Sequence, residues 1–264
     1  MSAVIASITR THPAARALLV DVTRCIGCRA CAQACKESHG FPGTGEETEL
    51  DATTYTVLLD KGEDRYVRRL CMHCEDPSCA SACPVGAFTK TALGPVTYDE
   101  SRCLGCRYCM LACPFGVPRY EWSKAAPAVR KCDMCVERLR KGALPACVEA
   151  CPAEATVAGT REELLEEAHR RIRESPGAYH PHVYGETEVG GTSVLFLSPV
   201  PFEELGFAAV GTTPPPNLTW EALRKVPAVV SLGGAALFGV WWITHRRDEV
   251  AAAEASPTAA KEER

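Results

Sequence analysis

The stretch CLGCRYCMLACP, residues Cys103–Pro114, carries four cysteines in the spacing C-x2-C-x2-C-x3-C-P. Three thiols within the seven residues 103–109 can face one small metal centre from the same side, whereas the fourth, held by the rigid proline, points elsewhere. The stretch CIGCRACAQACK, Cys25–Lys36, repeats this spacing with Lys36 in place of the proline. Two copies of so specific a spacing favour metal ligation by these cysteines.

Two further groups of four cysteines widen the second gap of the motif. CMHCEDPSCASACP (71–84) widens it to four residues and CDMCVERLRKGALPACVEACP (132–152) to eleven. Because loop closure costs entropy only logarithmically, neither insertion excludes a ligand role. The insertion VERLRKGALPA (136–146) predicts a short helix and a turn at the surface, where a partner can dock. All 16 cysteines of the 264-residue chain fall into these four groups.

Composition narrows the possible functions. The net charge of −4 is spread over both signs without a basic run, which argues against nucleic acid as a partner. Structural zinc is the main alternative metal, but a third cysteine three positions after a C-x2-C pair would then have no metal to bind. Disulfides fit poorly, because cysteines this close in sequence rarely pair well. No nucleophile, general base or substrate pocket accompanies the cysteines, so we expect no catalytic residues.

With these motifs, the chain resembles the four-cluster iron–sulfur subunits of respiratory membrane oxidoreductases. The resemblance rests on CIGCRACAQACKE, CMHCEDPSCASACPVGA, CLGCRYCMLACPFGVPRYEW and RKCDMCVERLRKGALPACVEACP. It is greatest to the β subunit of membrane-bound formate dehydrogenase and to the ferredoxin-like subunit of membrane-anchored nickel–iron hydrogenase. It implies an α+β fold of two nested bacterial-ferredoxin-like dicluster units, with four 4Fe–4S clusters as cofactors.

The same resemblance implies four ligand sets, named here sites A to D, in which the first motif pairs with the fourth and the second with the third. Site A is Cys25, Cys28, Cys31 and Cys151; site B is Cys132, Cys135, Cys147 and Cys35; site C is Cys71, Cys74, Cys79 and Cys113; site D is Cys103, Cys106, Cys109 and Cys83. The last cysteine of each set crosses over from the partner motif. His73, inside CMHC, could replace a thiolate, but because the cysteines alone suffice as ligands we interpret it as a hydrogen-bond donor beside a cluster or simply as an exposed residue.

The rest of the sequence gives an expected domain organisation in four parts. These are the double dicluster domain (16–159), an extension with a helix, a short strand and a Pro-rich linker (160–219), a transmembrane helix (220–247) and a charged, disordered tail (248–264). Within the first part, TTYTVLLDKGEDRYVRRL (53–70) is typical of a β-hairpin inserted between motifs. In the extension, Thr160 and Glu163 form a capping-box pattern, and GTTPPPN (211–217) predicts a stiff polyproline-like linker.

The membrane prediction rests on VPAVVSLGGAALFGVWWIT (226–244), which has no charge and the length needed to span a bilayer. Basic residues flank both ends, and Trp241 and Trp242 suit the headgroup region. The first twenty residues show no signal peptide. We therefore expect a single-pass protein of the inner membrane, with the cysteine domain on the periplasmic side after export on a partner's signal.

The resemblance implies an electron-transfer subunit that is not itself catalytic. Electrons would pass between a catalytic molybdopterin subunit (formate dehydrogenase) or nickel–iron subunit (hydrogenase) and an integral membrane cytochrome b or quinone-reactive subunit. One alternative is the equivalent subunit of a sulfur-, nitrogen-oxyanion or sulfoxide reductase. Another, from a different class, is a zinc-stabilised membrane scaffold.

Overall fold

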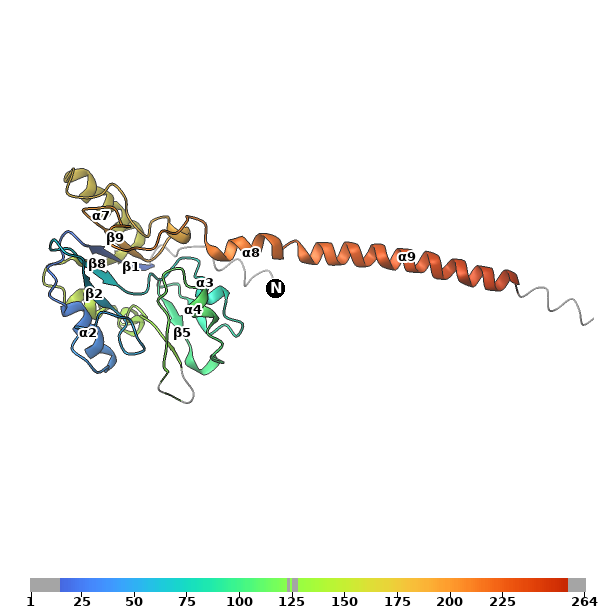
Figure 1. Cartoon of the computed structure of the whole chain (residues 1–264), viewed down its shortest axis with the longest axis horizontal. Helices are drawn as coiled ribbons and strands as arrows, with labels where there is room; N and C mark the ends of the chain where they lie inside the picture. Colours follow the sequence, from blue (N-terminus) through green and yellow to red (C-terminus); the bar gives the residue numbers. More distant parts are fainter. Residues whose placement is uncertain (1–14, 123, 125–127, 256–264) are drawn as a thin grey trace, which may run out of the picture. The chain divides into compact units, whose positions relative to one another are not determined.

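The computed structural model describes residues 15–122, 124 and 128–255 (Figure 1). The chain forms two compact units, Met1–Pro216 and Asn217–Arg264. The first unit mixes short strands and helices around the cysteine motifs, as expected for the α+β class, and the second is helical.

The elements of the first unit are short. The strands are β1 (Arg16–Asp21), β2 (Val57–Asp60), β3 (Tyr66–Arg69), β4 (Phe88–Lys90), β5 (Val96–Tyr98), β6 (Arg119–Tyr120), β7 (Val129–Arg130), β8 (Thr156–Thr160) and β9 (Val194–Leu197). The helices are α2 (Ala30–His39), α3 (Ser78–Ser81), α4 (Tyr108–Ala112), α5 (Val136–Arg140), α6 (Ala146–Glu149) and α7 (Arg161–Glu174), with 3-10 turns at Glu100–Arg102 and Glu188–Gly190.

A three-stranded sheet ties the start of the described chain to its later parts. Strand β1 lies in the middle, antiparallel to β8 and parallel to β9. Because side chains alternate along a strand, Ala17 and Leu19 pack on one face against α7, in a cluster with Leu164. Leu18 and Val20 face the other way, toward the cysteine motifs. The two faces of one strand therefore serve two cores.

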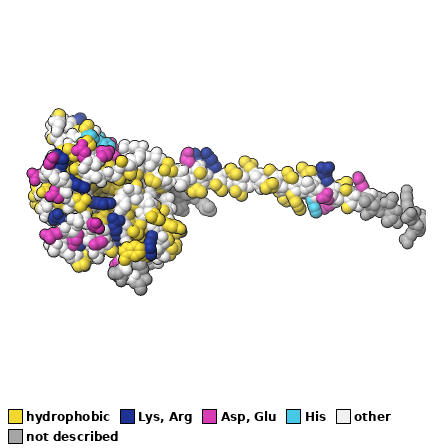
Figure 2. All heavy atoms as spheres, in the orientation of Figure 1, with side chains coloured by type: hydrophobic (Ala, Val, Ile, Leu, Met, Phe, Trp, Pro, Cys, Tyr) yellow, Lys and Arg dark blue, Asp and Glu magenta, His cyan; other side chains and the backbone are white. Residues whose placement is uncertain are grey.

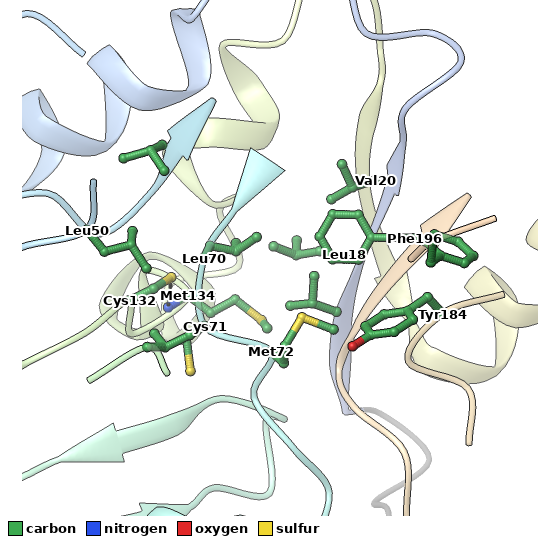
Figure 3. Packing of buried hydrophobic residues seen from close by; sticks show 14 residues of the cluster. Leu18, Val20, Leu50, Leu70, Cys71, Met72, Cys132, Met134, Tyr184 and Phe196 are labelled. Carbon is green, nitrogen blue, oxygen red and sulfur yellow. Dashed lines mark hydrogen bonds between the residues drawn. The ribbon is translucent and has the colours of Figure 1, made fainter. Parts of the chain in front are cut away.

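The core on the motif side joins the sheet to the second and fourth cysteine motifs. Figure 3 shows the side chains of Leu18, Val20 and Phe196 on the sheet facing Met72 and Met134. Cys71 and Cys132 belong to the same buried cluster (Figure 3). The apolar core thus continues directly into the proposed ligand sets.

The hairpin predicted between the first two motifs is present. Strands β2 and β3 pair antiparallel, from Val57 opposite Arg69 to Asp60 opposite Tyr66. Strands β4 and β5 pair antiparallel between the second and third motifs, and strands β6 and β7 pair antiparallel between the third and fourth. The insertion in the fourth motif contains α5, and residues 140–144 lie exposed before α6 begins, as the sequence predicts.

The helix of the extension, α7, begins with the predicted capping box between Thr160 and Glu163. Its Arg171 reaches back to the sheet and forms a buried ion pair of 2.9 Å with Asp21, whose carboxylate also accepts from Tyr179. The helix therefore does more than cover the surface, because it holds the end of β1 in place.

The second unit holds most of α8 (Pro215–Leu223) and all of α9 (Val226–Ala255). One helical stretch, Pro215–Glu254, is long and apolar enough, by length and composition, to cross a membrane. Figure 2 shows apolar side chains along α9, with Lys and Arg side chains near both ends of the apolar run.

Two expectations for this region need correction. The polyproline-like linker was predicted to run through Asn217, but Pro215 and Pro216 form the first turn of α8, where proline costs no hydrogen bond. The disordered tail was predicted from residue 248, but α9 continues to Ala255 because the alanines of this stretch are strong helix formers. Residues 256–264 lie outside the described part of the chain.

Candidate metal-cluster sites

Each C-x-x-C pair of the four motifs contains a residue with left-handed backbone. The residue before the second cysteine has a φ between 49° and 75°, in the left-handed region; these residues are Gly27, His73, Gly105 and Met134. The turn aims backbone N–H groups at the first sulfur of the pair: Gly105 donates to Cys103 Sγ at 3.4 Å, and Met134 donates to Cys132 Sγ at 3.3 Å. Such bonds favour a thiolate and stabilise negative charge on a bound cluster.

Two cavities gather cysteines from motifs far apart in the sequence. One is lined by Cys25, Cys28, Cys31 and Cys151, which are the four members of site A. The other is lined by Cys71, Cys74, Cys79 and Cys113, which are the four members of site C. In each cavity, the crossing cysteine comes from a different motif than the other three. This arrangement suits a small cube held from two sides.

The cysteines of sites B and D are brought together as well. The thiol of Cys132 interacts electrostatically with those of Cys35 and Cys147. The thiol of Cys135 interacts with that of Cys147. In site D, Cys109 interacts in the same way with Cys103, Cys106 and Cys83.

Several of the buried thiols have raised pKa values. Burial, helped by repulsion from neighbouring thiolates, raises the pKa of Cys79 to about 12 and that of Cys109 to about 11. The pKa values of Cys74 and Cys132 are raised well above the usual range for the same reasons. Four thiolates can share one of these sites only around positive charge, so metal binding must release protons.

A buried histidine beside site C indicates whether the cavity suits a cluster. The backbone N–H of Val96 donates to Nδ1 of His73 at 2.9 Å, so the proton of the neutral ring resides on Nε2. Nε2 is fully buried and has no hydrogen-bond partner among the described residues, and His73 lines the cavity of site C. A sulfur of a cluster in that cavity is an acceptor of the kind this donor lacks. The donor set and its surroundings therefore fit a 4Fe–4S cluster.

Comparison with known proteins agrees with this geometry. The profile of the 4Fe-4S dicluster domain family matches residues 63–161, which contain the second, third and fourth motifs. The Hydrogenase-2 operon protein HybA of Escherichia coli O157:H7 is 40% identical over 239 residues, covering 73% of each chain. The iron-sulfur subunit of the nitrate-inducible formate dehydrogenase of Escherichia coli K12 is 38% identical over 209 residues, covering 72% of this chain and 70% of the subunit. A protein of Nitratidesulfovibrio vulgaris is 47% identical over 254 residues, covering 90% of this chain and 69% of its own.

The chain belongs to the family of iron–sulfur subunits that includes HybA and the formate dehydrogenase subunit. It is an electron-transfer subunit whose cofactors are 4Fe–4S clusters, and its 16 cysteines suit four of them.

Cysteines of different sites also lie close together in the iron–sulfur subunit. Burial, and with it a thiolate at Cys147 of site B, raises the pKa of Cys31 of site A. Cys132 of site B and Cys71 of site C belong to one buried cluster. Cys79 of site C and Cys109 of site D pack together in another. Site A thus lies near site B, site B near site C, and site C near site D.

Sites A and D of the iron–sulfur subunit carry exposed apolar side chains. Ile26, in the first motif, is 62% exposed, and Leu104, at the same position of the third motif, is 60% exposed. Leu111 and Trp122, near site D, are exposed as well. The guanidinium of Arg107 stacks on the ring of Trp122, which holds the edge of this patch in place.

Beside site B, a histidine–carboxylate pair fixes the cysteine loops. Nε2 of His39 lies 3.1 Å from the carboxylate of Asp133, which also accepts from the backbone N–H of Cys135. Nδ1 of His39 lies 2.8 Å from the carbonyl oxygen of Cys35. The side chains of His39, Asp133 and Cys135 approach one another closely enough to hold a metal ion. Because Cys135 is a motif cysteine, we interpret the pair as support for site B.

One group near the sites is not indicated by the sequence, the guanidinium of Arg68, which lies on strand β3 of the hairpin and is buried. Alternation along the strand does not predict this, because Val67 and Arg68 are adjacent and both buried.

Proposed function

We propose that this iron–sulfur subunit relays electrons one at a time along a line of four 4Fe–4S clusters in sites A, B, C and D. The observation that supports the proposal is that cysteines of neighbouring sites pack together: Cys132 and Cys71 share one buried cluster, and Cys79 and Cys109 share another. Each bound cluster accepts and donates a single electron. The chain holds successive clusters near one another, excludes water from the inner ones and leaves the two ends accessible.

The ligand sets of sites A to D are part of the proposal, together with the nesting of one dicluster unit inside the other. The cavities of sites A and C support the sets, because each is lined by three cysteines of one motif and one of another. The nested arrangement follows from the pairing. The motifs at Cys71 and Cys103 form one unit, and the motifs at Cys25 and Cys132 enclose it in the sequence.

The partners follow from the exposed ends and from the relatives. We assign the apolar side chains at sites A and D to the places where electrons enter and leave, because an exposed apolar patch marks a contact surface. The named relatives belong to hydrogenase and formate dehydrogenase systems. The partners proposed here are accordingly a catalytic nickel–iron or molybdopterin subunit and a quinone-reactive or cytochrome b subunit in the membrane.

Helix α9 anchors the subunit in the inner membrane under this proposal, with the cysteine domain on the periplasmic side. Spheroplasts treated with protease should lose the cysteine domain while the apolar segment stays protected. Complete protection of the domain would place it in the cytoplasm. Purification of the complex through this subunit then names the catalytic partner, by its nickel or its molybdenum.

The primary test is metal analysis of the full chain, purified without oxygen. We expect about sixteen irons per chain and, after reduction, broad EPR signals from interacting clusters. Bound zinc with neither iron nor EPR signals would identify a scaffold and overturn the electron-transfer proposal.

The ligand sets are tested by two cysteines of the same motif. Cys109 is assigned to site D, but Cys113, four residues later, is assigned to site C. Cys113→Ser should alter the same EPR signal as Cys74→Ser, whereas Cys109→Ser should alter a different one. If Cys109→Ser and Cys113→Ser alter one common signal, the crossing is wrong and each motif holds its own cluster.

A further inference from the structure

Arg68 is a buried cation without a carboxylate partner. Arg68 is 3% exposed and belongs to the hairpin strand β3. Nε donates to the hydroxyl of Thr56 at 3.0 Å, and one terminal nitrogen donates to the hydroxyl of Thr156 at 3.3 Å. Both acceptors are neutral, and within the described ranges of the chain no Asp or Glu forms an ion pair with this guanidinium.

The negative charge near Arg68 comes from cysteines of two neighbouring sites. The thiols of Cys147, Cys31 and Cys132 lie close enough to Arg68 for their charge to raise the pKa of its guanidinium, although burial works against this. Cys31 belongs to site A, whereas Cys147 and Cys132 belong to site B. Arg68 also lines the cavity of site A. The cation thus lies at the boundary between two successive sites.

Burying an unpaired charge is costly, and arginine cannot lose its proton to avoid that cost. A chain that retains such a group needs a compensating negative charge. A cluster with four thiolate ligands carries net negative charge, and each one-electron reduction adds one more unit without any proton. The positive charge of Arg68 therefore offsets the negative charge that accumulates on the clusters of sites A and B during electron transfer.

We propose that Arg68 is a shared countercharge for sites A and B. It raises the reduction potentials of both sites and weakens the repulsion between electrons on them. The inference rests on the proposed four-cluster relay. Arg68 acts as a positioning residue for charge, since it neither binds iron nor carries an electron. The cysteines near Arg68 named above all belong to sites A and B, so the effect is assigned to these two sites.

The test is a redox titration of the full chain in its isolated complex, followed by EPR. Each cluster should give a single wave that corresponds to the uptake of one electron. The Cys109→Ser and Cys113→Ser proteins assign the waves of sites D and C, which leaves the other two to sites A and B. In Arg68→Gln, we expect the waves of A and B to move to lower potential. The expected shift is a tenfold change in the ratio of reduced to oxidised cluster at fixed ambient potential, which is about 59 mV for one electron.

Two matched variants separate charge from shape. Arg68→Lys keeps the charge and should leave the waves of A and B near their original potentials. Arg24→Gln removes an exposed cation beside Cys25, and solvent screening should make its effect much smaller than that of Arg68→Gln. Asp21, the partner of Arg24, keeps its ion pair with Arg171 in this control.

The outcomes are distinct. Unchanged waves in Arg68→Gln, or an equal shift of all four, would overturn the countercharge while leaving the relay intact. If Arg68→Gln loses the clusters of A and B, Arg68→Lys decides: clusters restored at the original potentials support the countercharge, and clusters still missing show that the shape of the guanidinium is what matters. A wild-type chain without four waves contradicts the relay itself.

Discussion

The four cysteine motifs share one turn but occupy two different environments. In the first and third motifs, which belong to the end sites A and D, the two residues inside the C-x-x-C pair are an exposed apolar residue and a glycine: Ile26 and Gly27, or Leu104 and Gly105. In the second and fourth motifs, which belong to the inner sites, the residue in the glycine's place is a buried side chain, His73 or Met134.

The choice between glycine and a larger residue follows from the side chains that surround each turn. A Cβ on Gly27 would lie 2.6 Å from an atom of the Tyr66 ring, and a Cβ on Gly105 would lie 2.6 Å from the Tyr120 hydroxyl oxygen. At the ends, an aromatic side chain approaches the turn too closely for any side chain there. In the interior, Met134 fills the shared core, so the strain of a positive φ is offset by packing.

The largest effect should come from removing this packing at an inner turn. Met134→Ala keeps the backbone strain but deletes a side chain that is 2% exposed, so we expect a loss of about 2–5 kcal/mol in stability. Leu104→Ala, at an end motif, should change stability by less than about 0.5 kcal/mol because the side chain is exposed. Denaturation followed by loss of cluster absorbance measures both. Equal losses in the two variants would abolish the distinction between inner and outer motifs.

A smaller effect is expected from adding a side chain at an outer turn. Gly105→Ala introduces a left-handed alanine and a clash with the Tyr120 hydroxyl, which should cost about 1–3 kcal/mol in the same denaturation measurement. Tyr120→Phe removes the clashing oxygen, so adding Gly105→Ala to that background should cost less. If the cost is the same in both backgrounds, the close approach of Tyr120 does not explain the glycine.

The smallest effect concerns His73 and bears on the inner site C alone. His73→Asn retains an acceptor for the Val96 N–H but removes the Nε2–H donor, whereas His73→Gln retains a donor at that position. Loss of one hydrogen bond, about 0.5–1.5 kcal/mol, should lower the potential of site C in the asparagine variant. Redox titration measures the shift. A shift in the glutamine variant as large as in the asparagine variant would mean that this donor does not face the cluster.

The sequence predicts those features that short-range chemistry dictates. The cysteine spacing indicates clusters because thiols must converge on one centre, and two strand-like runs joined by a short polar turn predict the hairpin of β2 and β3. The capping box at Thr160 follows from local hydrogen bonding. Within the candidate sites, the sequence singles out the motif cysteines but indicates neither the burial of His73 nor that of Arg68.

What the sequence does not reveal depends on partners far along the chain. Nothing near Leu18 indicates that Val194 will pair with it, because parallel pairing over such a separation leaves no local pattern. Arg68 appears as one of two hairpin arginines until its contacts with Thr156 and Cys147 are known. The helical start at Pro215 was missed because three consecutive prolines suit either an extended chain or a first helical turn.

Strand β1 has a consequence for how the protein is made. Its two neighbours in the sheet are residues 156–160 and 194–197, so β1 finds its last partner only after about 170 further residues have been synthesised. Contacts of such long range form late. The same late segment contacts the second cysteine motif, because the backbone N–H groups of Ser193 and Val194 donate to the carbonyl oxygens of His73 and Met72. Synthesis of residues 193–197 therefore completes the sheet and the surroundings of the second motif together.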